Sequence, residues 1–462
     1  MSLTLDHTAL RAAADGAALV LAPADAGFDA AQQILAGGVR STPGAVVRPA
    51  DAGGVARAIR FAREHDVELV VRSGGHSALG RGRHDGALVL DLRGLDAVTI
   101  DPSTRTATAG GGVTAASYTA AAAEHGLATP FGDTGTVGVA GITLGGGVGF
   151  LSRRLGMTVD SLRSAEVVTA DGETLHADSR EHPDLFWGLR GGGGNLGVVT
   201  RLTFDLHAQG EIVGGPLVLA ATAASVAGVI TALREAPREL AAVVMVMVAP
   251  PMPFLPPEVH GRLICLVNLC WSGAPDAAES AVAPLRAIGA DAGGVLADLV
   301  RTGPYLGLLE GPEGPPFATR LRSFFADDLD EAVASELVAA LESGTAPMRA
   351  VQLRVLGGAV ADVAEDATAF AHRDAVLTGA VLAAAPTPEQ ADEHTGWVGD
   401  LADRIRAGRP GAYVNFVPDG DPALLAEAYP GRTGTRLAQV KAAYDPQNLF
   451  RGNLNVPPSR SA

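Results

Sequence analysis

Three clusters of glycine interrupt the regular patterns of this 462-residue sequence, at residues 74–82, 132–149 and 191–197. Each cluster lies where a strand or helix pattern breaks off. Glycine has no side chain and tolerates positive φ, so its backbone can approach a ligand closely and present unshielded N–H groups to it. The clusters therefore predict either tight turns or a cradle for a ligand such as a pyrophosphate. Glycine alone does not choose between these two.

The residues around the clusters exclude several familiar sites. No GxxxxGK[ST] stretch is present, which excludes a P-loop, and no G-x-G-x-x-G joins a first strand to a helix, which argues against a Rossmann site. No GxSxG elbow surrounds a serine, which disfavours a serine hydrolase. His76 stands inside the first cluster without an HxxxH or Cys/His group near it, so we predict no metal site.

Composition describes a globular chain, and its length favours two or three domains. Apolar residues make up 47% of the sequence, and no apolar run approaches the roughly 18 residues of a membrane helix. The N-terminal segment lacks the basic leader of a secretory signal. The net charge of -16 opposes binding to phosphate backbones. We therefore expect a cytoplasmic protein with neither a membrane nor a nucleic-acid partner.

Periodic patterns predict mixed helices and strands in the first half of the chain. TPGAVVRP is predicted to be extended, DAGGVARAIRFAREHD to be a helix, and VELVV and ALVLDL to be strands. A helix that starts near residue 113 is predicted to stop at Gly126. Asp171-Gly172 predicts a type I′ turn between two strands, and residues 198–206 alternate as a further strand.

The character of the sequence changes at about residue 209, where glycine clusters thin out. GPLVLAA, AAVVMVMV and RLICLVNL are predicted strands separated by helices, which indicates a second α+β domain. Cys265 and Cys270 are five residues apart in one strand and therefore face opposite sides, so we predict buried thiols and neither a disulfide nor a metal site. After residue 412, AYVNF is predicted to be extended, and DPALLAEAY and RLAQVKAAY to be helical.

Several stretches together resemble the flavin domain of the p-cresol methylhydroxylase/vanillyl-alcohol oxidase superfamily. They are RSGGHSALG, DGALVLDLRGLDAV, GDTGTVGVAGITLGGGVGFLSRRLGMTVDSL and HPDLFWGLRGGGGNLGVVTRLTF. The C-terminal YDPQNLFRGNLNV resembles the berberine bridge enzyme-like branch, in particular its bacterial members of the 6-hydroxy-D-nicotine oxidase type. The resemblance implies a two-domain α+β flavoprotein. An FAD-binding domain at 1–208, with its core at about 40–208, would be followed by a substrate-binding α+β domain at 209–412 and a return to the FAD domain at 413–462.

The resemblance also assigns the cofactor. In that family the histidine of the R-[SG]-G-G-H loop is bonded through a ring nitrogen to the 8α-methyl carbon of FAD, and by position this is His76. An imidazole with a pKa of about 6.5 is sufficiently neutral at pH 7 to act as the nucleophile. Many members add a second bond through a cysteine, but Thr134 stands at that position here, so attachment through His76 alone is implied. The other predicted FAD contacts are Arg72, Ser73, Gly74, Gly75, Ser77, Gly80, Asp133, Thr134, Val137, Gly138, Gly141, Gly145, Gly149, Val199, Asn415 and Asn453.

The reaction implied is hydride transfer from a substrate C–H to the flavin, followed by reoxidation by O2 to hydrogen peroxide. Val137 stands where a small branched residue in relatives lets oxygen reach the flavin, which favours an oxidase. Phenols can act as the base when nearby charge lowers their pKa, and the candidates are Tyr413, Tyr429 and Tyr305, each of which could instead be a core or rim residue. Gln352 stands where relatives often have glutamate, and glutamine cannot take a proton.

Other residues of the same segments have less defined roles. Arg354 shares a strand face with Gln352, where it either steers an anionic substrate or is a solvated strand residue. His372 and Arg373 are assigned a structural role. We thus expect an FAD-dependent oxidase acting on a small secondary-metabolite-type alcohol, amine or ring C–H. The alternatives are a dehydrogenase or sugar oxidase of the same fold, or a flavin-binding protein without catalysis. The sequence selects neither the substrate nor the oligomeric state.

Overall fold

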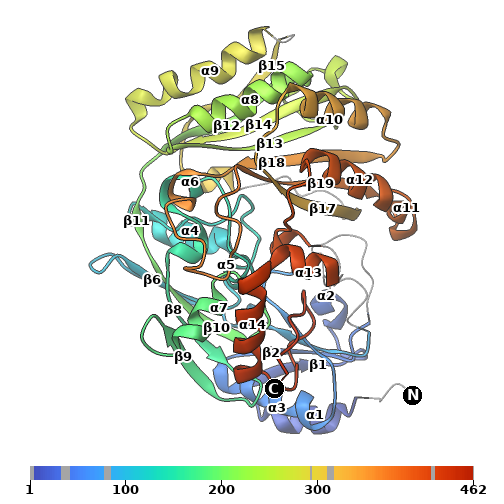
Figure 1. Cartoon of the computed structure of the whole chain (residues 1–462). Helices are drawn as coiled ribbons and strands as arrows, with labels where there is room; N and C mark the ends of the chain where they lie inside the picture. The colour runs from blue at the N-terminus through green and yellow to red at the C-terminus, as the bar shows by residue number, and fades with distance from the viewer. Residues whose placement is uncertain are drawn as a thin grey trace.

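The computed structural model describes residues 5–32, 42–77, 85–291, 294–309, 317–417 and 422–460. Figure 1 shows a lower part formed by both ends of the chain and an upper part formed by its middle. Helices and strands alternate in both parts, which confirms the predicted α+β class. A residue predicted to bind the cofactor, Gly80, lies outside the described residues.

A small four-stranded sheet begins the lower part, in the order β1-β2-β4-β3. β2 and β3 each pair in parallel with β4, as expected where a helix connects the first two strands. The side chain of Asp51 starts that helix, α3, by accepting a hydrogen bond from Gly54 N at 2.7 Å. These elements are α1 (His7–Ala14), β1 (Ala18–Leu21), α2 (Phe28–Gln32), β2 (Ala45–Pro49), α3 (Ala52–Glu64), β3 (Leu69–Arg72) and β4 (Leu88–Asp91).

An antiparallel five-stranded sheet follows, in the order β5-β6-β10-β8-β9. Short helices lie in the glycine-rich connections of this sheet, and they carry the second and third glycine clusters toward the first. The strands are β5 (Val98–Asp101), β6 (Thr106–Gly110), β8 (Leu162–Val168), β9 (Thr174–Asp178) and β10 (Val198–Asp205), with β7 (Leu127–Ala128) pairing β11 (His207–Ala208). The helices are α4 (Ala115–Ala123), α5 (Val139–Leu144), α6 (Ser152–Leu155) and α7 (Pro183–Leu189).

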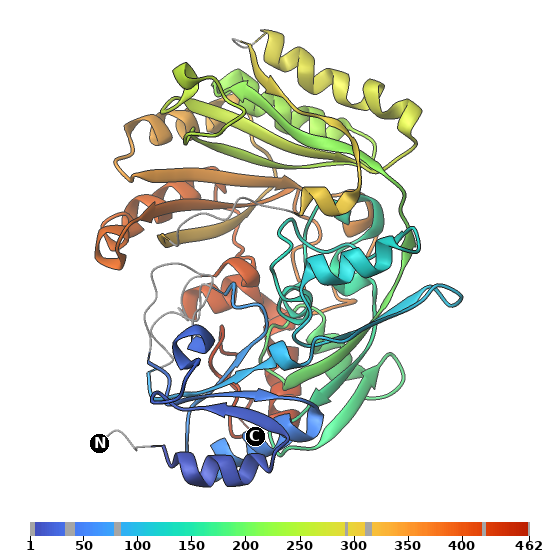
Figure 2. The ribbon, with the colours of Figure 1, turned by 180° about the vertical axis from the view of Figure 1, so that it is seen from behind.

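The upper part is an eight-stranded sheet in the order β15-β12-β14-β13-β18-β19-β17, with β16 also pairing β12. Helices α8, α9, α10 and α12 bury their apolar side chains in one core with the same face of this sheet, and Figure 2 shows the green and yellow helices α8 and α9 above it. The strands are β12 (Ile212–Ala220), β13 (Leu240–Val248), β14 (Leu263–Trp271), β15 (Val295–Asp298), β16 (Arg301–Gly303), β17 (Ala318–Ala326), β18 (Met348–Val355) and β19 (Leu377–Ala385). The helices are α8 (Ala223–Glu235), α9 (Ala278–Asp291), α10 (Glu331–Ser343), α11 (Pro388–Asp392) and α12 (Thr395–Ile405).

The opposite face of the large sheet is turned toward the lower part. Val351 and Leu353 of β18 lie in the core beneath the helices. Because side chains alternate along a strand, Gln352 and Arg354 point the other way. The chain then returns to the lower part through α13 (Pro422–Ala428) and α14 (Gly431–Tyr444), drawn in red in Figure 1, and α14 packs against α7. The sheet thus forms a roof above the glycine-rich loops.

Two local predictions were wrong. Residues Val414–Phe416 of AYVNF form a short 3₁₀ helix and not an extended strand. The hairpin between β8 and β9 has no two-residue type I′ turn, because Asp171 lacks the positive φ that such a turn requires of both central residues. Instead, Thr169 N donates to Glu173 O and Gly172 alone has positive φ, +80°, so the loop is three residues long with glycine in its left-handed position.

The two cysteines confirm the strand prediction. Cys265 and Cys270 are both free and fully buried. Cys265 belongs to the core beneath the helices, whereas Cys270 contacts a separate cluster that includes Tyr305, so the two thiols face opposite sides of β14. Burial raises the pKa of each thiol to about 12. Among the described residues, no helix has both the length and the apolar character needed to cross a bilayer.

Candidate active site

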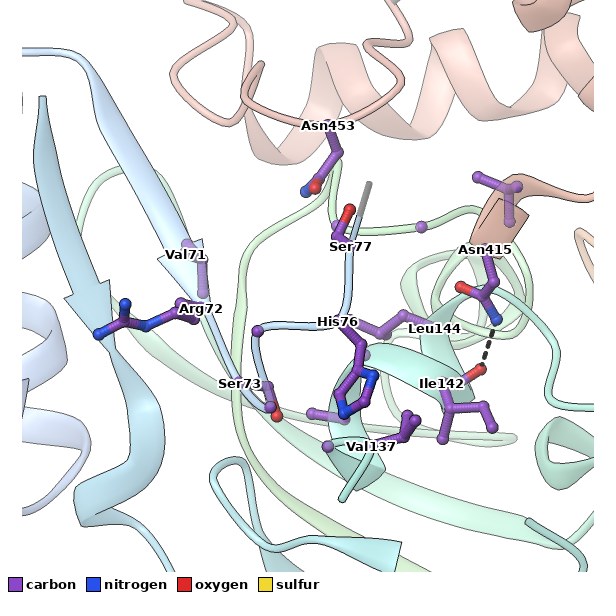
Figure 3. A pocket seen from close by; sticks show the side chains of 18 of the residues that line it. Val71, Arg72, Ser73, His76, Ser77, Val137, Ile142, Leu144, Asn415 and Asn453 are labelled. Atoms are coloured by element: carbon purple, nitrogen blue, oxygen red, sulfur yellow. Dashed lines mark hydrogen bonds between the residues drawn. The ribbon is translucent and has the colours of Figure 1, made fainter. Parts of the chain in front are cut away.

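A cavity of about 430 Å³ lies between the glycine-rich loops and the roof sheet. Most of its wall comes from the loop after β3, the segment that contains α5, the turn before β10, and the C-terminal return after residue 412, and Gln32, Pro43, Val89 and Leu92 also line it. β17 and β18 of the large sheet close it from above with Leu321, Gln352 and Arg354. Figure 3 shows His76 projecting into this space between the segments that carry Ser73, Val137 and Ile142.

The loop after β3 and the start of α5 touch backbone to backbone. A Cβ added at Gly74 would collide with the backbone of Gly138, and one added at Gly138 would collide with the side chain of Ser73 and the backbone of Gly74. Gly75 has φ +76°, a conformation that favours glycine. Ser73 Oγ donates to Gly111 O at 2.7 Å and fixes the other side of the loop. The glycines at 74 and 138 are therefore required for this close approach.

His76 is half-buried at the cavity wall. Its Nε2 lies 3.0 Å from Oγ1 of Thr136, within hydrogen-bond distance. Burial lowers the pKa of His76, and a backbone hydrogen bond with Thr136 opposes that shift. The lowered pKa favours the neutral imidazole, the form that can act as a nucleophile.

Arg72 contributes to the site through a buried ionic cluster. Its side chain points away from His76 in Figure 3 and donates to Asp91 Oδ2 at 2.9 Å, which also accepts from Arg48 and Arg93. Burial alone would raise the pKa of Asp91, but hydrogen bonds from Arg93 and the charge of Arg72 hold it well below the ordinary value. Arg72 lines the cavity and at the same time anchors the end of β3.

Two asparagines of the C-terminal return lie where glycines leave room for them. A Cβ at Gly145 would collide with the side-chain amide of Asn415, and a Cβ at Gly194 would collide with Nδ2 of Asn453. Asn415 Nδ2 donates to Ile142 O at 3.1 Å, the contact drawn in Figure 3. The cavity is thus an elongated cradle of bare backbone with amide side chains along it, and such a cradle fits a dinucleotide such as FAD.

The structure brings together most residues predicted to bind the cofactor. Those that line the cavity are Arg72, Ser73, Gly74, Gly75, His76, Ser77, Asp133, Thr134, Val137, Gly138, Gly141, Val199, Asn415 and Asn453. Gly145 and Gly149 are not among the described lining residues. Gly145 makes space for Asn415, and a Cβ at Gly149 would collide with the backbone of Phe131. Leu321 and Phe416 also line the cavity, and sequence reasoning missed them because single apolar residues carry no motif.

Tyr413 is the candidate base that the structure places at the cavity. Its hydroxyl oxygen accepts hydrogen bonds from Gly147 N and from Asn415 Nδ2, each at 3.0 Å. Burial raises the pKa of Tyr413, whereas these hydrogen bonds and the charge of Arg354 oppose the rise. A phenolate at this position would be stabilised by two donors before any substrate binds.

Tyr305 and Tyr429 are not brought to the cavity wall among the described lining residues. Both side chains are buried, and neither hydroxyl has a hydrogen-bond partner among the described residues. Burial raises the pKa of each phenol. A base must lie within hydrogen-bond reach of its proton, so the geometry favours Tyr413 over these two.

Arg354 is not the solvated strand residue that was one of its two predicted roles, because it is 4% exposed. Its side chain lines the cavity and is ion-paired with Asp133, so the other role, steering an anionic substrate, stays a prediction. Arg354 also donates from Nη1 to Gln352 Oε1 at 3.0 Å and lies 5.3 Å from the ring centroid of Phe416. The pair links the roof sheet to the loop at residues 132–134.

His372 and Arg373 have the structural environment that was predicted for them. Arg373 is 2% exposed and pairs with Asp160 at 2.6 Å. Nε2 of His372 lies 2.9 Å from Glu427 O, on the C-terminal return. Both residues fasten the segment after residue 368 to its neighbours.

Comparisons with known proteins agree with this site. A family model described as an FAD binding domain matches residues 43–178, and one described as berberine and berberine like matches residues 412–457. The chain is 32% identical to (R)-6-hydroxynicotine oxidase of Paenarthrobacter nicotinovorans, over 96% of this chain and 97% of that protein.

Solved structures agree as well. The crystal structure of 6-hydroxy-D-nicotine oxidase from Arthrobacter nicotinovorans matches with a TM-score of 0.85 at 28% identity, over 96% of this chain and 98% of that one. A xylooligosaccharide oxidase from Myceliophthora thermophila in complex with xylobiose matches with a TM-score of 0.85 at 25% identity, over 98% and 100%. The p-cresol methylhydroxylase/vanillyl-alcohol oxidase type of fold is thereby confirmed, and the chain belongs to the berberine bridge enzyme-like family of FAD-dependent oxidoreductases.

Proposed function

We propose that this protein is an oxidase that carries FAD bound covalently through His76 and transfers a hydride from a small, neutral secondary-metabolite-type substrate. The observation that carries the proposal is the position of Tyr413, whose hydroxyl accepts two hydrogen bonds at the wall of the cavity that also holds His76. FAD, when bound, supplies the hydride acceptor and passes the electrons to O2 as hydrogen peroxide.

The chain's own residues bind and orient the reactants. The bare backbone around Gly74 and Gly138 would hold the cofactor's phosphates, and Asn415 and Asn453 would hydrogen-bond its ring or ribityl chain. Tyr413 would take the proton from the substrate O–H or N–H, assisted by Gly147 N and Asn415. The small side chain of Val137 at the wall supports access of O2.

The charges of the cavity favour a neutral substrate. Beside Gln352 in the roof of the cavity, Arg354 is paired with Asp133. An anionic substrate at the roof would therefore meet an arginine whose charge is already compensated, whereas Arg72 shares the single carboxylate of Asp91 with Arg48 and Arg93 and points away from His76. Gln352 gives its oxygen to Arg354, so its amide N–H₂ is left as a donor for a hydroxyl, ether or carbonyl oxygen. Such a pocket suits alcohols, phenols and uncharged ring systems.

A sugar oxidase is the second candidate. Sugars are neutral and rich in hydroxyl oxygens, which matches the donor that Gln352 offers, and the xylooligosaccharide oxidase shares the fold at 25% identity. The 6-hydroxynicotine oxidase is more similar in sequence, with 32% identity over nearly the whole chain. We therefore place a small ring-bearing alcohol or amine first and an oligosaccharide second.

Two further points belong to the proposal. The domain boundaries are placed at 208/209 and 412/413, between β11 and β12 and just before Tyr413. Attachment is placed at His76 alone, because Thr134 holds the position of the second tether, and its Oγ1 donates to Asp133 Oδ1 at 3.1 Å.

The test begins with purified full-length protein denatured in acid. Yellow colour and flavin fluorescence should stay with the polypeptide, and His76→Ala should release them. The native protein is then mixed in air with matched sets of neutral alcohols, phenols, amines and oligosaccharides, and hydrogen peroxide is measured. A substrate that bleaches the flavin in the absence of oxygen but yields no peroxide in air would indicate a dehydrogenase. No bleaching with any member of the panel would favour a flavin-binding protein without catalysis.

A further inference from the structure

His76 has a hydrogen-bond partner to which neither the glycine motif nor the tether assigns a role. Nε2 of His76 lies 3.0 Å from Oγ1 of Thr136. Thr136 comes just before Val137 in the loop that leads into α5, so this contact joins the loop after β3 to the second glycine cluster. The neighbouring Thr134 differs, because its hydroxyl donates to Asp133 instead.

The contact determines which ring nitrogen is available. A threonine hydroxyl can accept a hydrogen bond from a ring N–H, and the nitrogen within hydrogen-bond distance of Oγ1 of Thr136 is Nε2. When the hydroxyl accepts in this way, the hydrogen of the neutral imidazole lies on Nε2 and the lone pair lies on Nδ1.

We propose that Thr136 is a positioning residue for flavin attachment: it holds the imidazole of His76 at Nε2 and so leaves Nδ1 as the nucleophile for the 8α carbon of FAD. This inference rests on the proposed attachment through His76. Holding the ring restricts rotation about its side-chain bonds and fixes the tautomer, which are the two requirements for an oriented nucleophile.

The attachment step balances with O2, the oxidant that the proposed function already uses. One C–H bond of the 8α-methyl group and the imidazole N–H bond break, and one N–C bond forms between Nδ1 and the 8α carbon. Two electrons pass through the flavin ring to O2. The two protons leave with them as H2O2, and the flavin is returned to its oxidised form.

The experiment compares full-length variants of two threonines. Thr136→Val removes the hydroxyl with little change in volume, Thr136→Ser keeps it, and Thr99→Val is the matched control because Thr99 is an exposed residue of β5 outside the described lining of the cavity. Each protein is incubated with FAD in air, samples are precipitated with acid over time, and the fraction of flavin that stays with the polypeptide is measured. Any variant that is purified without flavin is measured in the same time course.

Thr136→Val should attach flavin about tenfold more slowly, the effect expected for the loss of one oriented hydrogen bond, while Thr136→Ser and Thr99→Val attach it at the wild-type rate. Non-covalent FAD should still bind to Thr136→Val, as measured by quenching of flavin fluorescence. Should Val be poorly tolerated, Thr136→Ala provides the same comparison.

These outcomes distinguish the role of Thr136 from the proposed attachment through His76. Wild-type rates in both Thr136→Val and Thr136→Ala would overturn the role of Thr136 while attachment through His76 stands. Linkage of the wild-type flavin through Nε2, identified on the isolated flavin peptide by NMR, would also overturn it. Release of free flavin from the wild type in acid would instead refute the attachment itself.

Discussion

The hydroxyl of Tyr413 is held by two donors, which makes it the most specific chemical feature at the scale of single residues. Tyr413→Phe should lower kcat by about 10²- to 10⁴-fold, because a positioned base contributes that much, while the flavin stays bound. Stopped-flow reduction of the flavin measures the effect. Tyr429→Phe is the matched control, since Tyr429 is buried away from the described lining of the cavity, and equal losses in both variants would contradict the assignment.

Asn415 gives a pH-dependent prediction at the same scale. Its hydrogen bond lowers the pKa of Tyr413 against the effect of burial. A leucine at position 415 removes that donor, so the pKa of Tyr413 rises and the ascending limb of the pH–rate profile should move to higher pH. A profile that stays in place in Asn415→Leu would show that ionisation of Tyr413 does not limit the reaction.

Asp91 makes a prediction about stability. It is fully buried among Arg48, Arg72 and Arg93, and its pKa in the folded protein lies below the unfolded value of about 3.9. Its contribution is therefore fully present above the unfolded pKa and lost as the pH falls through the folded pKa. Asp91→Asn should cost about 3–5 kcal/mol at pH 7. Urea unfolding at several pH values should show the gap from wild type narrowing below about pH 4, whereas a constant gap would argue for a packing defect.

At the scale of elements, the glycine clusters determine how closely the loops approach. Gly138→Ala would drive a Cβ into Ser73 and the backbone of Gly74, so the loop that carries His76 must move away from α5. We expect loss of most bound FAD, measured by the flavin-to-protein absorbance ratio, and a lower Tm. Gly399→Ala in α12 is the control, because a Cβ there meets no atom within 4 Å. Normal flavin content in Gly138→Ala would show that the contact is dispensable.

The helix α14 is fastened by a buried ion pair. Lys441 is fully buried and donates to Asp445 Oδ2 at 2.5 Å, to Asn195 O and to Phe450 O. Lys441→Met leaves the carboxylate of Asp445 buried without its cation and should lower the free energy of unfolding by about 3–5 kcal/mol. The double variant Lys441→Met/Asp445→Asn should recover part of that loss in thermal unfolding, and no recovery would indicate that the carbonyl contacts of Lys441 dominate.

At the scale of the whole molecule, Arg354 and Asp133 connect the roof sheet to the FAD-binding part. Asp133→Asn leaves the charge of Arg354 uncompensated at the cavity wall, in a side chain that is only 4% exposed to solvent. Anions should then bind, so inhibition by a small carboxylate such as benzoate should strengthen by about tenfold. Asp133→Asn/Arg354→Met should lose this effect. Benzoate inhibition unchanged in Asp133→Asn would show that the pair does not govern the charge of the pocket.

Local patterns were sufficient for elements whose periodicity and caps agree. α3 begins at Asp51 and β14 alternates as predicted, because each is decided by burial of one face and by residues within a few positions of its ends. The turn at Asp171-Gly172 and the segment Val414–Phe416 were mispredicted because both have partners outside the local sequence. Arg60 and Arg63 of α3 donate to the carbonyls of Gly172 and Ala170, and Val414–Phe416 lies against the cavity.

The sequence by itself determined the cofactor class, the predicted tether and the backbone positions that must be glycine, because a motif with a spacing records which atoms have to approach a ligand. Only the tertiary structure decided which side chains meet around that motif. It separated Tyr413 from Tyr429 and Tyr305, paired Arg354 with Asp133, and placed Thr136 beside His76. Each of these depends on segments distant in sequence, or on the direction of one side chain in a loop, and hydrogen bonds and ion pairs of that kind form only after the chain has packed.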